Sequence, residues 1–389
     1  MSKWEMVKLG DMCSLIGGGT PERSNTEYWN GSIPWISVKD FKSLTIDSAQ
    51  ESITELGLKN SASNLIPSGT IVIPTRMALG KVAVCSVDAA INQDLKAISI
   101  NDKSKLLNEY LIYTLLSKSK YIESRGKGAT VKGVTLDVIK SIEFPLPPLD
   151  IQKQIVARLE LAQAMIDQRK QQVGLMDDLI QSTFYEMFGD PVKNEKGWKK
   201  GTIGDLAIKT QYGTSEKADE TTGEFPVLRM NNISYQGGWD FSKLKYINLN
   251  TKDQARYLVH KGELLFNRTN SKELVGKTAV FRENVPMAFA GYLVKLTPNK
   301  NGNAEYISAY LNSPYGKLIL LGMAKSIVGM ANINAEELKS IPINIPPIEL
   351  QNIFADKVHA ILRLKNEMAA SLTELEQNFN ALMQQSFAG

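Results

Sequence analysis

The sequence predicts an α+β protein made of two globular domains and two long, paired helices. Three observations support this fold class. An internal repeat covers nearly all of the 389 residues, each copy ends in a long segment of helical periodicity, and the rest of each copy holds short β-rich runs. We expect globular domains at residues 1–149 and 190–348, and long helices at residues 150–189 and 349–389.

The repeat is visible as motifs that recur at offsets of 192 to 199 residues. Trp4 recurs as Trp198, and the pair Pro147-Pro148 recurs as Pro346-Pro347. The first copy also contains three consecutive glycines, in "LIGGGTPERS" (residues 15–24). Their spacing fits neither a dinucleotide loop nor a nucleotide-triphosphate loop, so a turn is expected instead. The dipeptide Gly19-Thr20 recurs as Gly213-Thr214, which predicts a Gly-Thr turn shared by both copies.

The long helices are predicted by the segments that follow the two Pro-Pro pairs. A Pro-Pro pair ends any preceding helix, and Asp150 or Glu349 then places a carboxylate in the first turn of the next one. Apolar residues recur at steps of three and four over about 38 positions, or roughly 57 Å of helix. A single apolar stripe of that length needs a partner, so the two helices are expected to pair; packing of each helix onto its own globular domain is the alternative. Gly174 is either a tolerated defect or a point of close approach.

The globular domains contain signals for both strands and helices. Residues 70–73 and 263–266 are β-rich runs bounded by turn residues, and they predict one strand in each copy. Apolar residues within 109–116 and 305–311 recur at helical spacing. Each globular domain is therefore expected to be α+β.

Composition excludes several classes of protein. Apolar residues make up 43% of the chain, yet no run of about 18 apolar residues exists, so a folded, cytoplasmic protein is expected. The two cysteines, Cys13 and Cys85, indicate neither a disulfide framework nor a zinc cluster. The two histidines, His260 and His359, stand in no catalytic motif and are expected to be a turn residue and a helix residue. The sequence thus predicts no catalytic residue and no metal ligand.

Basic charge lies on the globular domains. Residues 1–149 hold 17 Lys and Arg against 15 Asp and Glu, and residues 190–348 hold 21 against 15. The helical segments carry 4 against 6 and 3 against 5. This distribution is typical of two nucleic-acid-binding domains joined by helices that do not themselves attract phosphates.

Candidate DNA contacts fall into three groups. The basic, glycine-rich loop at residues 124–133 can bind successive phosphates, although a merely solvated loop is the alternative. Thr75-Arg76 and Arg268-Thr269 stand in similar places after a strand, with a Gly-Lys pair shortly beyond each. Arg, Asn and Gln side chains can read base edges. The candidate set is Arg76, Lys81, Gln93, Arg125, Lys127, Thr130, Lys132, Arg229, Asn231, Asn232, Asn267, Arg268, Asn270, Lys272, Lys277, Lys325 and Asn332.

The ordered set of motifs resembles a known family. The stretches are "EYWNGSIPW" (residues 27–35), Asn92-Gln93-Asp94, "PLPPLDIQKQIV" (145–156), "FYEMFGDP" (184–191) and "NIPPIELQNIF" (344–354). Together they look like the specificity (S) subunit of type I restriction-modification systems, over essentially the whole chain.

The resemblance implies two target recognition domains joined by an antiparallel pair of long helices. Each domain would read one half of a split double-stranded DNA sequence, and the helices would set the gap between the halves. It also implies docking of two methyltransferase (M) subunits and of restriction (R) subunits. S-adenosylmethionine, ATP and Mg²⁺ would be used by those partners, and no cofactor by this chain, which would not itself be an enzyme. A stand-alone nucleic-acid-binding or scaffold protein without a methyltransferase partner is the alternative.

Overall fold

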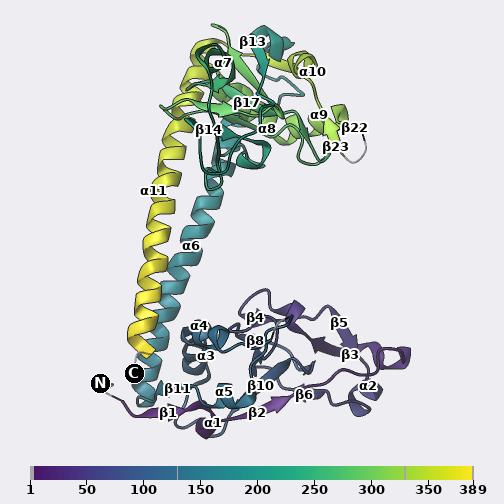
Figure 1. The fold of residues 1–389 in the computed structure, drawn as a ribbon, viewed down its shortest axis with the longest axis vertical. Coiled ribbons are helices and arrows are strands. Elements are labelled where there is room, and N and C mark those ends of the chain that lie inside the picture. The colour runs from purple at the N-terminus through teal and green to yellow at the C-terminus, as the bar shows by residue number, and fades with distance from the viewer. Residues whose placement is uncertain (1–3, 129, 328–329, 388–389) are drawn as a thin grey trace. The chain divides into compact units, whose positions relative to one another are not determined.

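The computed structural model of the chain describes residues 4–128, 130–327 and 330–387, except for the side chains of residues 325–327 (Figure 1). The described residues form two compact units. Unit 1 holds the residues up to Gln168 and those from Leu372 onward, and unit 2 holds Arg169–Ser371. Each unit combines sheets with helices, so the α+β prediction is confirmed.

Unit 1 contains three sheets among its described residues. The five-stranded sheet has the order β2 (Cys13–Gly17), β10 (Leu95–Ile100), β7 (Ile71–Pro74), β8 (Ala83–Cys85), β4 (Thr45–Ile46). The four-stranded sheet has the order β5 (Glu51–Ile53), β3 (Trp29–Ile36), β9 (Ala89–Ile91), β6 (Asn64–Ile66). Strand β1 (Met6–Lys8) pairs with β11 (Glu143–Pro145). The shorter helices are α1 (Leu9–Met12), α2 (Glu55–Lys59), α3 (Asn108–Ser117), α4 (Ser119–Ser124) and α5 (Leu136–Lys140).

Unit 2 repeats this plan. One four-stranded sheet has the order β13 (Ala207–Tyr212), β21 (Leu293–Pro298), β17 (Leu264–Asn267), β19 (Thr278–Val280). The other has the order β15 (Lys245–Ile247), β14 (Phe225–Leu228), β20 (Met287–Phe289), β16 (Leu258–Val259). Strand β12 (Lys199–Thr202) pairs with β24 (Pro342–Ile345), and β18 (Thr269–Asn270), β23 (Met330–Asn332) and β22 (Lys325–Ile327) form a third sheet. The shorter helices are α7 (Thr251–Tyr257), α8 (Ala304–Asn312), α9 (Pro314–Met323) and α10 (Ala335–Ser340).

Equivalent central helices anchor the core of each unit. Helices α3 and α8 cover the expected helical runs, and β7 and β17 each lie one residue later than the expected strands. The hydroxyl of buried Tyr110 on α3 donates to the Pro145 carbonyl at 2.9 Å, and that of Tyr306 on α8 donates to the Asn344 carbonyl at 2.6 Å. Burial without a charged partner raises the pKa of both phenols, so each stays a neutral donor. The central helix of each unit is thereby tied to the short two-stranded sheet beside it.

Two helices of 40 residues each follow the Pro-Pro pairs: α6 (Leu149–Phe188) and α11 (Ile348–Phe387). In unit 1 the first half of α6 packs beside the last turns of α11, with Leu159 and Phe387 in one apolar cluster. In unit 2 the last half of α6 packs beside the first turns of α11, with Phe184 and Phe354 in one cluster. The two helices therefore pair in opposite directions, as expected, and each also packs on its globular neighbour (Figure 1).

A buried glutamine explains the motif that follows each Pro-Pro pair. Gln152 accepts the backbone N–H of Leu107 at 2.9 Å and donates to two carbonyls, at 2.7 and 2.8 Å. Gln351 accepts the backbone N–H of Asn303 at 2.9 Å and also donates to two carbonyls, at 3.0 and 2.9 Å. Both side chains are fully buried. Each glutamine thus fixes the first turn of a long helix to the loop that leads into α3 or α8.

The glycine turn is shared by both units, but its alignment differs by one residue from the expectation. A Cβ atom on Gly18 would lie 2.0 Å from the Ile91 carbonyl oxygen, and one on Gly213 would lie 2.3 Å from the Phe289 carbonyl oxygen. These contacts allow only glycine, because real Cβ atoms do not approach oxygen that closely. The structural counterpart of Gly213 is therefore Gly18, and Gly19 corresponds to Thr214.

Candidate nucleic-acid interface

The same backbone frame occurs at the end of strands β7 and β17. The N–H of Thr75 donates to the Asp94 carbonyl at 2.7 Å, and the N–H of Arg268 donates to the Tyr292 carbonyl at 3.0 Å. The carbonyl of each of these residues accepts one further N–H, at 2.9 Å in both units. Thr75 and Arg268 are therefore equivalent positions.

This register agrees with the predicted correspondence of Thr75-Arg76 with Arg268-Thr269, and it offsets the two arginines by one position. Arg76, the residue after Thr75, bridges Gly133, and Thr269, the residue after Arg268, pairs with Asn332. Neighbouring residues of an extended chain point to opposite sides. Arg76 and Arg268 thus do not occupy the same place, and each unit presents its arginine from a different side of the shared frame.

In unit 2 the arginine is held by an aromatic ring and an amide. The guanidinium carbon of Arg268 lies 4.8 Å from the centroid of the Tyr212 ring, within the range of a cation–π contact. One guanidinium nitrogen donates to the Asn332 side-chain oxygen at 3.3 Å, and the Asn332 amide donates to the Thr269 hydroxyl at 2.9 Å. The Tyr212 hydroxyl accepts the N–H of Ala335, the first residue of α10, at 3.0 Å. Arg268 is therefore held in a preferred orientation before any ligand binds.

In unit 1, polar residues at the same end of the shared backbone frame line a surface hollow of about 370 Å³. Arg76, Gln93, Asp94 and Lys127 all contribute to it. Arg76 lies 3.8 Å from the Asp94 carboxylate, yet its side chain stays mostly exposed, so the ion pair is weak and the guanidinium is accessible. The Gln93 side chain accepts a hydrogen bond from Thr20, which joins the glycine turn to the hollow. Three sequence candidates and a conformationally restricted turn thus meet at one place.

The basic loop of unit 1 lies against the same hollow. The backbones of Lys127 and Gly133 exchange two hydrogen bonds, both of 2.9 Å, which closes the loop. Arg125 lies over the Tyr121 ring at 5.0 Å, and the side chains of Thr130 and Lys132 are exposed. Exposed cations on a closed loop suit phosphate contacts.

Two lysine candidates donate to backbone carbonyls, but only Lys277 is buried, and Lys81 is exposed. The Lys81 ammonium donates to the Phe41 carbonyl at 3.0 Å, and the Lys277 ammonium donates to the carbonyls of Met230 and Ile233 at 2.8 and 2.5 Å. Burial lowers the pKa of Lys277 below its usual value. Lys277 is buried in this way and is not placed to contact DNA, whereas Lys81 stays exposed and its DNA contact remains a prediction. The acceptor of Lys81 directly follows the short 3-10 helix η2 (Val38–Asp40), and the two acceptors of Lys277 are the first residue of η4 (Met230–Asn232) and the residue directly after that helix.

Two asparagine candidates also lie in the interior. Asn232 is buried, accepts the Arg229 N–H at 2.9 Å and donates to the Asp240 carbonyl at 2.8 Å, so it caps η4. Asn267 is fully buried at the end of β17, and among the described residues its side-chain amide has no hydrogen-bond partner. Neither amide can reach a base edge in this conformation.

The remaining candidates of unit 2 have less defined surroundings. Arg229 donates to the Lys243 carbonyl at 2.8 Å, and Asn270 accepts the N–H of Ser271 at 2.9 Å. The side chains of Asn231 and Lys272 are exposed. The backbone of Lys325 pairs with Asn332, but its side chain lies outside the described residues.

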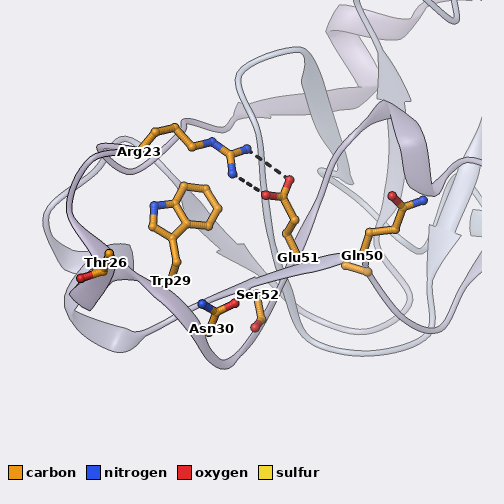
Figure 2. A pocket seen from close by; sticks show the side chains of 8 residues that line it. Arg23, Thr26, Trp29, Asn30, Gln50, Glu51 and Ser52 are labelled. Atoms are coloured by element: carbon orange, nitrogen blue, oxygen red, sulfur yellow. Dashed lines mark hydrogen bonds and ion pairs between the residues drawn. The ribbon is translucent and has the colours of Figure 1, made fainter.

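Unit 1 also has a second hollow, of about 360 Å³, that the sequence candidates did not include (Figure 2). The guanidinium of Arg23 lies over the Trp29 ring, 3.9 Å from its centroid, and forms an ion pair with Glu51. Asn30 and Ser52 complete one side of the hollow. The hydrogen bond from Arg23 lowers the pKa of Glu51, so this carboxylate stays charged. Tyr212 and this Arg23–Trp29 pair were missed because an aromatic residue next to a cation in space leaves no local sequence signal.

Two further features bear on function. Among the described residues, no group of three or more His, Cys, Asp and Glu side chains is placed to hold a metal ion. None of the helices in that part of the chain has the length and apolarity needed to cross a membrane.

Comparison with known proteins identifies the family that has this architecture. The model of the type I restriction modification DNA specificity domain matches residues 1–173 and again residues 195–377. A Methanocaldococcus jannaschii type I restriction enzyme MjaIX specificity subunit is 27% identical over 290 residues, which cover 68% of this chain and 66% of that protein. The Escherichia coli EcoR124I/EcoR124II specificity subunit is 35% identical over 163 residues, 40% of each chain. The match to these two relatives therefore spans less than two thirds of their length.

Other relatives match over nearly the whole chain. The Escherichia coli EcoKI specificity subunit is 22% identical over 410 aligned positions, covering 99% of this chain and 88% of that protein. The fold is shared with the crystal structure of a type I restriction-modification system S subunit from M. genitalium, with a TM-score of 0.53 and 14% identity over 100% of this chain and 96% of that one. A structure from a study of complex assembly in a type I R-M system gives a TM-score of 0.64 and 19% identity, covering 99% and 98%. With the family's domain present twice, this chain belongs to the type I restriction modification DNA specificity family.

Proposed function

We propose that this chain is the DNA-recognition subunit of a type I restriction-modification enzyme and reads a split double-stranded target. One observation carries the proposal. The two units build the same backbone frame at the ends of β7 and β17, but place Thr75 and Gly17 in one unit where the other has Arg268 and Tyr212. A shared frame with different polar side chains suits two readers of different half-sites, because the side chains that reach base edges set sequence preference.

The proposal assigns the exposed cations and amides of each unit to one half-site. In unit 1 these are Arg76, Gln93, Arg125, Lys127 and Lys132, with Thr130 beside them. In unit 2 the guanidinium of Arg268 is the best placed group for bidentate recognition of guanine, since Tyr212 and Asn332 orient it. Exposed Asn231 and Lys272, and half-buried Asn270, would contact flanking bases or phosphates.

The paired helices would set the gap between the half-sites. Each is 40 residues long, and their opposite directions place the start of one beside the end of the other in both units. A two-copy chain of this kind suits two identical methyltransferase partners, because each copy can offer the same docking surface. We infer that the methyltransferase subunits bind S-adenosylmethionine and methylate adenine, and that restriction subunits use ATP and Mg²⁺.

The chain itself is proposed to be non-catalytic. Detectable methyl transfer by the purified chain alone would contradict that assignment. The competing function is a stand-alone nucleic-acid-binding or scaffold protein, which predicts no copurification with a methyltransferase subunit.

A methylome comparison tests the proposed function directly. DNA methylation is mapped at single-molecule resolution in a host that carries this chain with its M subunit and in a host that carries M alone. We expect a motif of two short defined halves around a fixed gap, methylated only when this chain is present. Absence of new methylation from a host in which the two proteins copurify would overturn the proposal.

A further inference from the structure

A buried carboxylate connects the globular part of unit 2 to long helix α11. Glu305, on α8, has a side chain that is only 5% exposed. Its two oxygens accept from the Nε and a terminal nitrogen of Arg282, at 2.7 and 2.6 Å, in a bidentate pair. The Nε2 atom of His359, on α11, lies 3.1 Å from the same carboxylate. Such a pair has a defined geometry, whereas the apolar contacts around it are not directional.

The cluster reaches the strand that carries the proposed reader. Arg282 lies two residues beyond β19, and β19 pairs with β17. Strand β17 ends at Asn267, directly before Arg268. A continuous path of hydrogen bonds therefore runs from His359 through Glu305 and Arg282 to the sheet whose strand β17 ends directly before Arg268.

The Glu305 carboxylate stays charged in this cluster. Burial alone would raise the pKa of Glu305, but the hydrogen bonds from His359 and Arg282 outweigh it and hold the pKa below the usual value. A second link lies nearby on the two long helices, where the Lys365 ammonium contacts the Asp177 carboxylate at 2.6 Å. Unlike that partly exposed pair, Glu305 is shielded from water, so removing one of its partners has a larger effect.

Unit 1 lacks this cluster. The register of strands β8 and β19 places Ser86 where unit 2 has Arg282, and the Ser86 hydroxyl donates to the Ile46 carbonyl at 3.2 Å. In the sequence repeat, Glu109 is the counterpart of Glu305, and Glu160 is the counterpart of His359. Both of these unit 1 side chains are exposed. Two carboxylates without an arginine between them cannot form the bridge.

We propose that Glu305 and His359 are positioning residues that fix the orientation of the second recognition domain on α11 and thereby the gap length that its half-site accepts. The inference rests on the proposed function. One base pair changes the distance between half-sites by about 3.4 Å and rotates one relative to the other by about 35°. A domain held by directional bonds rejects such a displaced half-site, whereas a domain held by apolar packing alone can adjust to it.

The test is His359→Ala, because the bidentate pair with Arg282 still holds the Glu305 carboxylate when the half-exposed His359 ring is removed. The variant is purified with its M subunit and assayed for methylation on DNA duplexes with the native gap and with gaps one base pair longer and shorter. We expect the preference for the native gap to fall about tenfold, the size expected for loss of a hydrogen bond to a charged group. His359→Gln keeps a donor at the same place and should restore most of the preference. Glu160→Ala, the matched change in unit 1, should leave it unchanged.

Three outcomes would contradict either the positioning role or the proposed function. An unchanged gap preference in a folded His359→Ala variant would overturn the positioning role. An equal loss with His359→Ala and His359→Gln would also overturn it, because the hydrogen bond would then not be the cause. Failure of the unaltered chain to direct methylation to any split motif would instead contradict the proposed function itself.

Discussion

At the scale of single residues, Arg268 and the Tyr212 ring beside its guanidinium give two separate predictions. Replacing Arg268 with Ala should relax or abolish the preference at one half-site and leave the other half-site unchanged. Relative affinities for a set of duplexes with single base changes would measure this. A uniform loss of affinity without altered preference would make Arg268 a phosphate contact instead.

Tyr212 should affect the same base position through Arg268. Tyr212→Ala removes the ring 4.8 Å from the guanidinium and should weaken discrimination by about 1 kcal/mol, the size of a partly exposed cation–π contact. Tyr212→Phe keeps the ring and loses only the bond to Ala335, so it should retain the discrimination at some cost in stability. Equal effects of both changes would show that the hydroxyl, and not the ring, holds Arg268.

Lys277 should behave as an interior residue despite its positive charge. Lys277→Met removes an ammonium that binds two loop carbonyls, and it should lower the free energy of unfolding by about 1–3 kcal/mol. The salt dependence of DNA binding should not change, because no phosphate contact is lost. Denaturant unfolding and affinity measured at several salt concentrations separate these two effects; a shallower salt slope in Lys277→Met would mean that the lysine reaches DNA.

At the scale of elements, the long helices and the central strand and helix of each unit were predictable, since proline positions and apolar spacing are local signals. The strand register was not. The one-residue difference between Gly18 and Gly19 depends on which carbonyl of a distant strand each backbone meets. The role of His359 was also hidden, because its partner Glu305 is far away in the sequence.

The start of each long helix should depend on its buried glutamine. Gln351→Leu leaves the N–H of Asn303 and two carbonyls without their partner in the interior, and should cost roughly 2–4 kcal/mol of stability. Gln154→Leu is a suitable control on α6, because Gln154 is exposed two residues after the equivalent Gln152. Thermal unfolding would show a large decrease for Gln351→Leu only; similar decreases for both changes would contradict the role of the buried bonds.

Gly174 gives the opposite case, a helix position with room for a side chain. A Cβ atom added there would meet nothing within 4 Å, so Gly174 is not a point of close approach. Gly174→Ala should therefore stabilise the protein by up to about 1 kcal/mol, since alanine lowers the entropy of the unfolded chain and favours helix. A decrease in the unfolding midpoint would indicate a contact made at Gly174 by a bound partner or a different helix geometry.

At the scale of the whole molecule, the repeat gives one chain two units of the same plan, as the proposed reading of two half-sites requires. Each unit uses a long helix from both copies, so neither long helix belongs to one unit alone. Unit 1 needs the end of α11, where Phe387 packs on Tyr110, and unit 2 needs the end of α6, where Phe188 packs on Tyr306. A change in the length of one helix alone would therefore disturb both units.

Matched deletions in the two helices test the spacer role without that disturbance. Removing residues 165–171 and 364–370 takes seven residues from each helix, which preserves the apolar stripe of both. Each helix shortens by about 10 Å, close to three base pairs of DNA, so the recognised gap should become shorter while both half-site sequences stay the same. A methylome of cells carrying this variant with M would give gap and half-sites together. Altered half-sites at an unchanged gap would contradict the spacer role, because reading and spacing would then not reside in separate parts of the chain.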